Sequence, residues 1–88
     1  MTIHLTVKGK VQGVFYRASA RDRALMLDIR GWVRNTAKGE VEIMASGSEQ
    51  SLISFIKWCK KGPSGAIVSD VVLVEIEQTD FNGFVILR

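Results

Sequence analysis

The residues of this sequence that could act on an anion lie close together near its N-terminus. A segment that contains two glycines, Gly9 to Tyr16, leads directly into Arg17, where a helix is expected to begin. Backbone N–H groups exposed in such a turn bind anions, and the dipole and unpaired N–H groups of a helix N-terminus add to the attraction. A guanidinium can hold two phosphate oxygens at once. The spacing predicts a phosphate site made of the amides of residues 12–17 and the Arg17 side chain.

The position of Arg17 supports this interpretation. A cation at a helix N-terminus interacts unfavourably with the helix dipole, and a bound anion would resolve that conflict. The segment has neither the GxGxxG nor the GxxxxGK[ST] pattern of nucleotide-binding loops. A tight strand-to-helix connection followed by a surface arginine is therefore the alternative.

The scarce residue types exclude other kinds of chemistry. The chain has one cysteine, Cys59, and one histidine, His4. A structural zinc site needs about four Cys or His ligands, and one cysteine cannot form an internal disulfide. Cys59 belongs to an apolar helical stripe and His4 to the polar face of a strand, so structural roles are favoured for both. We expect no metal and no cofactor.

The charge of the chain is unevenly distributed. Residues 1–38 carry eight basic residues against two acidic ones, a net charge of +6, and residues 39–88 carry four against seven, a net charge of −3. This asymmetry favours an anionic ligand at the first half, although solvated helix and strand faces would give the same distribution. The N-terminus has no signal-peptide pattern, and the longest aliphatic run, residues 71–74, is too short to span a bilayer. We expect a cytoplasmic protein.

The apolar pattern predicts alternating strands and helices. The expected elements are a strand from residue 3 to at least 7, a helix over 17–28, strands over 29–35 and 40–46, a helix over 48–61, and strands over 66–78 and 84–88. In the first helix, the residues available for an apolar stripe are Ala20, Ala24, Leu25 and Leu27. The order β-α-β-β-α-β with a short extra strand is typical of a ferredoxin-like α+β sandwich, an antiparallel sheet with two helices on one face. We expect residues 1–88 to form one domain.

This topology brings a second polar residue to the predicted phosphate site. The first two strands run parallel with the third between them, so their C-terminal ends lie on the same edge of the sheet, about 10 Å apart. Residues 12–17 follow one of these ends, and Asn35 ends the other. The carboxamide of Asn35 can both donate to and accept from a water molecule, although asparagine also commonly opens hairpin turns.

Two segments of the sequence resemble the signatures of the acylphosphatase family. They are VKGKVQGVFYR, residues 7–17, and GWVRNTAKGEVE, residues 31–42. The length, the order of elements, Gly62-Pro63 after the second helix and the ending at residues 84–86 are also similar, so the resemblance covers essentially the whole chain. The chain departs from the family pattern at three positions away from Arg17 and Asn35: Tyr16 replaces the usual Phe, Asp28 a frequent Gly, and Lys38 a common Asp.

The resemblance implies hydrolysis of the carboxyl–phosphate bond of small acyl phosphates to a carboxylate and inorganic phosphate. Arg17 matches the family's phosphate-binding arginine and Asn35 the asparagine that orients the attacking water. The residues that match the phosphate cradle are Gln12, Gly13, Val14, Phe15, Tyr16 and Arg17. Phosphoryl transfer depends mainly on positioning and charge stabilisation, so the reaction suits a chain without a catalytic histidine. We expect a monomer with neither nucleic-acid nor membrane partners.

Two other functions fit the same topology. One is a catalytically silent module that binds an anion or regulates a larger enzyme. The other is an RNA-binding domain, which would stack bases on aromatic residues of its central strands. The strand over residues 40–46 has two acidic residues and no aromatic one, which disfavours RNA binding.

Overall fold

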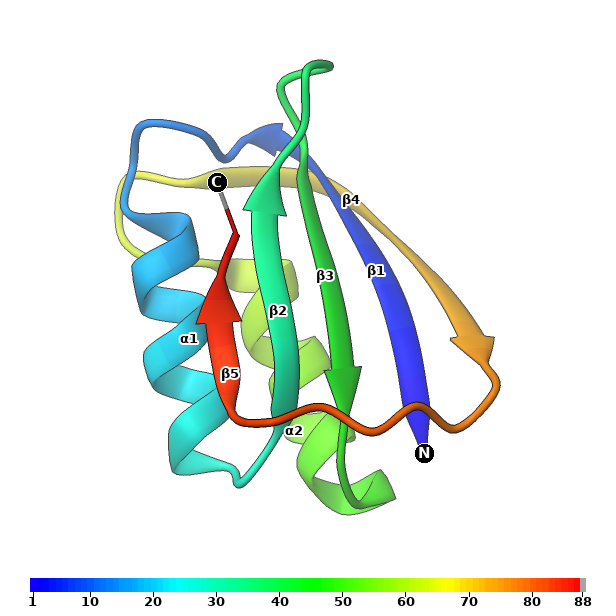
Figure 1. The fold of residues 1–88 in the computed structure, drawn as a ribbon. Helices are drawn as coiled ribbons and strands as arrows, with labels where there is room; N and C mark the ends of the chain where they lie inside the picture. Colours follow the sequence, from blue (N-terminus) through cyan, green and yellow to red (C-terminus); the bar gives the residue numbers. More distant parts are fainter. Residues whose placement is uncertain (88) are drawn as a thin grey trace.

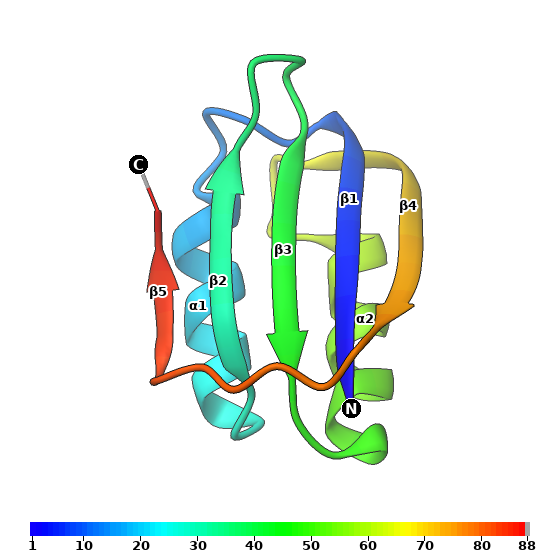
Figure 2. The same ribbon diagram turned by 45° about the vertical axis from the view of Figure 1, so that its right-hand side comes forward.

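The computed structural model describes residues 1–87, and its helices and strands follow the predicted order. They are β1 (Thr2–Lys10), α1 (Tyr16–Met26), β2 (Arg30–Asn35), β3 (Val41–Ser46), α2 (Glu49–Lys61), β4 (Ile67–Ile76) and β5 (Phe84–Ile86). Both helices cover one face of the sheet (Figure 1, Figure 2). The ferredoxin-like α+β fold is confirmed. Arg88, the end of the expected closing strand, lies outside the described residues.

The strand order places the ends of β1 and β2 at the same edge of the sheet. The order is β4-β1-β3-β2-β5, and both β1 and β2 are antiparallel to β3. They are therefore parallel to each other with β3 between them, as the topology predicts. Val7 and Asn35 both pair with Val41, from opposite sides. The loop that follows β1 and the residue that ends β2 thus emerge side by side.

One strand pair differs from the expected antiparallel sheet. β5 runs parallel to β2, so the sheet is mixed. After β4 the chain crosses the end of the sheet and arrives beside the start of β2 (Figure 1). The crossing is held by Thr79 N, which donates to Thr2 Oγ1 (3.0 Å), and by Gly31 N, which donates to the Gly83 carbonyl (2.9 Å). Because the crossing ends beside the first residues of β2, the strand that follows has to run in the direction of β2.

The core forms between the sheet and the helices, largely where the pattern predicts. The alternating apolar residues of β1 and β3 are at most 1% exposed, and α2 buries Leu52, Phe55 and Cys59. The apolar stripe expected for α1 is wrong at Leu25, which is 56% exposed. The buried face of α1 follows Tyr16, Ala20 and Ala24, and Leu25 lies about 100° around the helix from Ala24. The two alanines let α1 pack closely against the sheet.

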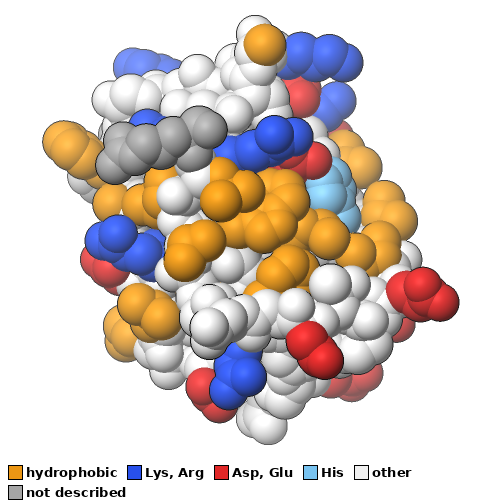
Figure 3. Space-filling model, viewed as in Figure 1, with side chains coloured by type: hydrophobic (Ala, Val, Ile, Leu, Met, Phe, Trp, Pro, Cys, Tyr) orange, Lys and Arg blue, Asp and Glu red, His pale blue; other side chains and the backbone are white. Residues whose placement is uncertain are grey.

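The other face of the sheet is open and carries a mixture of apolar and charged side chains. His4 on β1 contacts the Glu42 carboxylate (2.6 Å), which also accepts from Arg34. The hydrogen bond from His4, followed by that from Arg34, lowers the pKa of Glu42 below its usual range. Figure 3 shows apolar side chains gathered on this face beside the histidine. No helix within residues 1–87 is long and apolar enough to cross a membrane.

Candidate active site

Strand β1 bends where the loop of the site begins. The register between β1 and β4 shifts between Lys8 and Gly9, and Gly9 has a φ of 124°. A Cβ atom on Gly9 would lie 2.1 Å from the Ile67 carbonyl oxygen, so no other residue type fits without moving the backbone. Gly13, with a φ of 76°, has open space around it and serves the turn itself. The two glycines of the motif thus have different local roles.

The loop leads into a helix whose N-terminus has no cap. The N-cap position of α1 is Phe15, no side chain accepts from the first turn, and no acidic residue lies there. Within residues 1–87, the first hydrogen bond of the helix runs from Ser19 N to the Phe15 carbonyl (3.1 Å), and the backbone N–H groups from Gln12 to Ala18 have no protein acceptor. A helix N-terminus with unpaired donors attracts anions.

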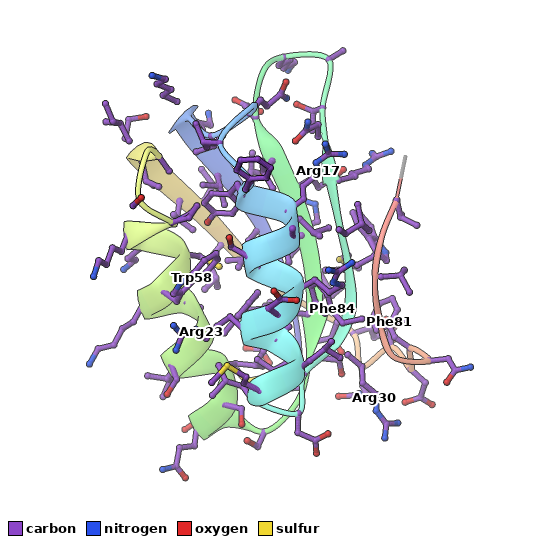
Figure 4. All side chains as sticks on the ribbon, turned by 90° about the vertical axis from the view of Figure 1, so that its left-hand side faces the viewer. Arg17, Arg23, Arg30, Trp58, Phe81 and Phe84 are labelled. Atoms are coloured by element: carbon purple, nitrogen blue, oxygen red, sulfur yellow. The ribbon has the colours of Figure 1, made fainter. Side chains whose placement is uncertain are left out.

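This helix end, Arg17 and Asn35 meet in one cavity of about 280 Å³. Figure 4 shows Arg17 at the start of α1, on the side toward β2. The cavity is lined by residues of the loop, of the first turn of α1, of the end of β2 and of β5: Val11, Gly13, Phe15, Tyr16, Arg17, Ala18, Asn35 and Ile86. The two side chains that the sequence singles out, 18 positions apart, therefore share a cavity. Ile86 was not expected there, because the pattern gives no information on where the closing strand pairs.

Arg17 has no partner for its charge within residues 1–87. Arg17 is half-buried and makes no ion pair or hydrogen bond there, whereas Arg34 pairs with Glu42 and Lys8 lies 3.8 Å from Glu40. A positive charge at a helix N-terminus is unfavourable by about 0.3–1 kcal/mol. The local arrangement thus leaves a positive charge at the helix N-terminus without a counter-charge from the described residues.

Asn35 likewise has an unused atom. Its Oδ1 is buried and accepts no hydrogen bond from the described residues. The turn that follows is closed without the Asn35 side chain, because Thr36 N donates to the Glu40 carbonyl (2.9 Å) and Glu40 N donates to Thr36 Oγ1 (3.2 Å). A buried acceptor without a partner costs about 1–3 kcal/mol. This oxygen is placed to accept from a ligand, such as a water molecule.

Gln12 and Val14 belong to the predicted cradle but do not line the cavity. Gln12 Nε2 donates to the carbonyls of Thr36 and Glu40, both at 2.9 Å, and so joins the loop to the hairpin that follows Asn35. Val14 packs against the core. The sequence carries no signal for the contacts of Gln12, because its partners are backbone carbonyls more than 20 residues away. Participation of the two backbone N–H groups in phosphate binding stays a prediction.

The ring of Tyr16 is buried, as expected for a packing position, and its hydroxyl has an additional role. It donates to the Cys59 carbonyl near the end of α2 (2.7 Å). In a longer helix the backbone N–H of residue 63 would donate to the Cys59 carbonyl, but residue 63 is a proline and has no N–H group. Burial raises the pKa of Tyr16 far above its usual range and that of the Cys59 thiol to about 12. Cys59 is fully buried, so its thiol is not accessible to a substrate.

Replacing Tyr16 with Phe is expected to lower the free energy of unfolding by about 1–2 kcal/mol, because the buried Cys59 carbonyl loses its donor. Urea denaturation of both proteins measures the difference. The expected effect on turnover is small, since the hydroxyl points away from the cavity toward α2. An unchanged unfolding free energy would show that the Cys59 carbonyl does not depend on this donor.

Comparison with known proteins gives consistent results. The family model of acylphosphatase matches residues 3–86. The acylphosphatase of Haloquadratum walsbyi is 48% identical over 85 residues, which are 97% of this chain and 91% of that protein. The structure of an acylphosphatase from Coxiella burnetii has a TM-score of 0.95 and 43% identity over 98% of this chain and 90% of that one. The Bacillus subtilis acylphosphatase structure also has a TM-score of 0.95, with 32% identity and coverage of 99% and 98%.

Proposed function

Because the chain belongs to the acylphosphatase family, we propose that its reaction takes place in the cavity where the uncapped end of α1 meets Arg17 and Asn35. The chain is an acylphosphatase and acts on small acyl phosphates. One observation carries the assignment of the site. Amides, a guanidinium and a carboxamide oxygen that have no partner among residues 1–87 all lie in or beside one cavity. The cation at the helix N-terminus and the buried oxygen are unfavourable in isolation, the amides are free to donate, and a phosphate with its attacking water satisfies all three.

The backbone amides of residues 12–17 and Arg17 hold the phosphate group. The amides donate to phosphate oxygens, and the guanidinium of Arg17 donates two parallel hydrogen bonds to two of them. These donors are fixed before substrate binds, so they stabilise the charge that spreads over the phosphoryl oxygens in the transition state without reorganising. Binding and charge stabilisation thus come from the same groups.

Asn35 positions the nucleophile. Its Oδ1 accepts a hydrogen bond from a water molecule and directs the water oxygen at phosphorus, in line with the bond to the acyl oxygen. A phosphorus–oxygen bond forms to the water, and the phosphorus–oxygen bond to the acyl group breaks, with its electron pair leaving on the carboxylate. A carboxylate has a pKa of about 4 and leaves without a general acid. The proton of the water passes to a phosphate oxygen of the substrate, so no histidine is needed.

Four further properties belong to the same proposal. Residues 1–88 act as one domain, the chain works as a monomer, it functions in the cytoplasm, and the reaction uses no metal. The thiol of Cys59 is free and buried, so it forms no disulfide with a partner chain and requires no oxidising compartment, which is compatible with the second and third points. The chemistry above supports the fourth.

An assay with acetyl phosphate in the presence of EDTA tests the function. The expected result is turnover well above the spontaneous rate, unchanged by EDTA and inhibited competitively by inorganic phosphate. Absence of turnover would contradict the enzymatic function, and binding of phosphate without turnover would indicate the silent anion-binding module instead. Loss of activity on addition of EDTA would contradict the proposal that no metal takes part.

A further inference from the structure

Phe15 lines the active-site cavity with an aromatic ring that almost nothing covers. Phe15 is 84% exposed, more than any other large apolar residue within residues 1–87, and it lines the cavity. An exposed apolar residue is by itself unremarkable on a protein surface. An exposed aromatic residue at a ligand cavity is different, because it offers apolar area to whatever the cavity binds.

The backbone of Phe15 makes this position more unusual. Its φ of 62° and ψ of 26° are in the left-handed region, which disfavours residues with a large side chain. The only other non-glycine residue with positive φ in the described part of the chain is Asp28, whose type tolerates the conformation better. A glycine at position 15 would remove the strain, as Gly13 does two residues earlier. Retained strain of this kind is typical of functional sites.

The lining of the cavity divides into two chemical classes, as the substrate does. Arg17, Asn35 and the loop amides are suited to the phosphate and the water, whereas Phe15 and the half-buried Ile86 are apolar. An acyl phosphate likewise joins a charged phosphate to an acyl group that can be apolar. We propose that Phe15 contacts the acyl group and determines specificity, favouring acyl phosphates with a flat aromatic acyl group over those with a small one. This inference rests on the proposed placement of the phosphate at Arg17.

The expected kinetic signature follows from where Phe15 acts. An aromatic acyl group can stack on the exposed ring in an offset arrangement, whereas an acetyl group offers little area to it. The contact involves no reacting atom, so it is equally strong in the bound substrate and in the transition state. Such uniform binding changes KM and leaves kcat unaltered.

The test compares benzoyl phosphate with acetyl phosphate as substrates of Phe15→Ala and Phe15→Leu. Replacement by Ala should raise the KM for benzoyl phosphate about tenfold relative to the KM for acetyl phosphate. The backbone amide of residue 15 also belongs to the phosphate site, and an effect through this amide would change the KM values of both substrates alike and cancel in their ratio. The KM of Phe15→Leu for benzoyl phosphate should lie between the values for Phe15→Ala and for the unchanged chain. Leu25→Ala is the matched control, since Leu25 is likewise an exposed apolar residue, on α1, but lies outside the cavity. Both Phe15 replacements keep a side chain at the strained position.

Three results would overturn the inference. The KM for benzoyl phosphate could stay the same in Phe15→Ala, which would place the acyl group elsewhere. The KM values for both substrates could rise by the same factor, with weaker inhibition by phosphate, which would show that Phe15 only shapes the loop. An effect of the same size in Leu25→Ala would show that the change is not local. Failure of the proposed site itself has a different signature, because inhibition by phosphate would then not depend on Arg17.

Discussion

Replacing Asn35 with Ala should lower kcat about 10²–10³-fold, the loss typical of removing one oriented polar group from an active site. The water molecule would still reach the cavity but would no longer be held in line with the bond that breaks. Phosphate binding depends on the loop amides and Arg17, so the inhibition constant for inorganic phosphate should change little. Measured together, kcat and this inhibition constant separate positioning of the water from binding of the substrate.

The same substitution should not destabilise the fold. Asn35 Oδ1 is buried without a partner in the described residues, so its removal breaks no hydrogen bond of the protein. Eliminating an unsatisfied buried acceptor is neutral or stabilising by about 1 kcal/mol. Urea denaturation measures the free energy of unfolding of both proteins. If the Asn35 side chain stabilised the turn instead, this free energy would fall in the variant.

Two results would contradict the role of Asn35. One is a kcat for Asn35→Ala close to that of the unchanged chain. The other is a loss of activity accompanied by an equal loss of stability, which would show that the residue supports the hairpin. Thr36→Ala is a suitable control, because Thr36 Oγ1 accepts from Glu40 N in the turn and lies outside the cavity. It should lower stability with little change in kcat.

The features that follow a local period or a topological rule could be predicted from the sequence. The alternation of Ile3, Leu5 and Val7 predicts which face of β1 is buried, and the order of elements predicts that β1 and β2 end side by side. Those two inferences are enough to bring residues 12–17 close to Asn35 without any knowledge of side-chain contacts. They hold because apolar burial and strand handedness act on the whole chain and leave few arrangements.

The features that depend on single distant contacts could not be predicted. The direction of β5 depends on the route of residues 77–83 across the sheet, which is held by contacts such as Thr79 with Thr2. The exposure of Leu25 depends on how closely Ala20 and Ala24 approach the sheet. The left-handed backbone of Phe15 has no counterpart in the hydrophobic pattern, because phenylalanine is an unusual residue for it. One side-chain contact was open to prediction, since Pro63 leaves the Cys59 carbonyl without its helical donor.

Replacing Arg17 with Ala should lower kcat/KM about 10³-fold or more, because an arginine on the transferred phosphoryl group stabilises both its binding and its transition state. Loss of two charge-assisted hydrogen bonds should also weaken binding of inorganic phosphate about 100-fold. Arg17→Lys should recover part of this binding, since it keeps the charge but lacks the planar fork. A phosphate affinity that does not change in Arg17→Ala would assign the residue to the surface instead of the site.

The stability of Arg17→Ala should depend on phosphate in a way that no surface arginine would produce. Without phosphate the variant should be more stable by about 0.3–1 kcal/mol, because a cation no longer opposes the dipole of α1. At a phosphate concentration 100 times its dissociation constant, the unchanged chain gains about 2.7 kcal/mol, whereas a variant that binds 100-fold more weakly gains only about 0.4 kcal/mol. The order of stability should therefore reverse as phosphate is added. Arg21→Ala is the control on the same helix, since Arg21 lies 3.5 Å from Asp22 and outside the cavity, and it should show no reversal.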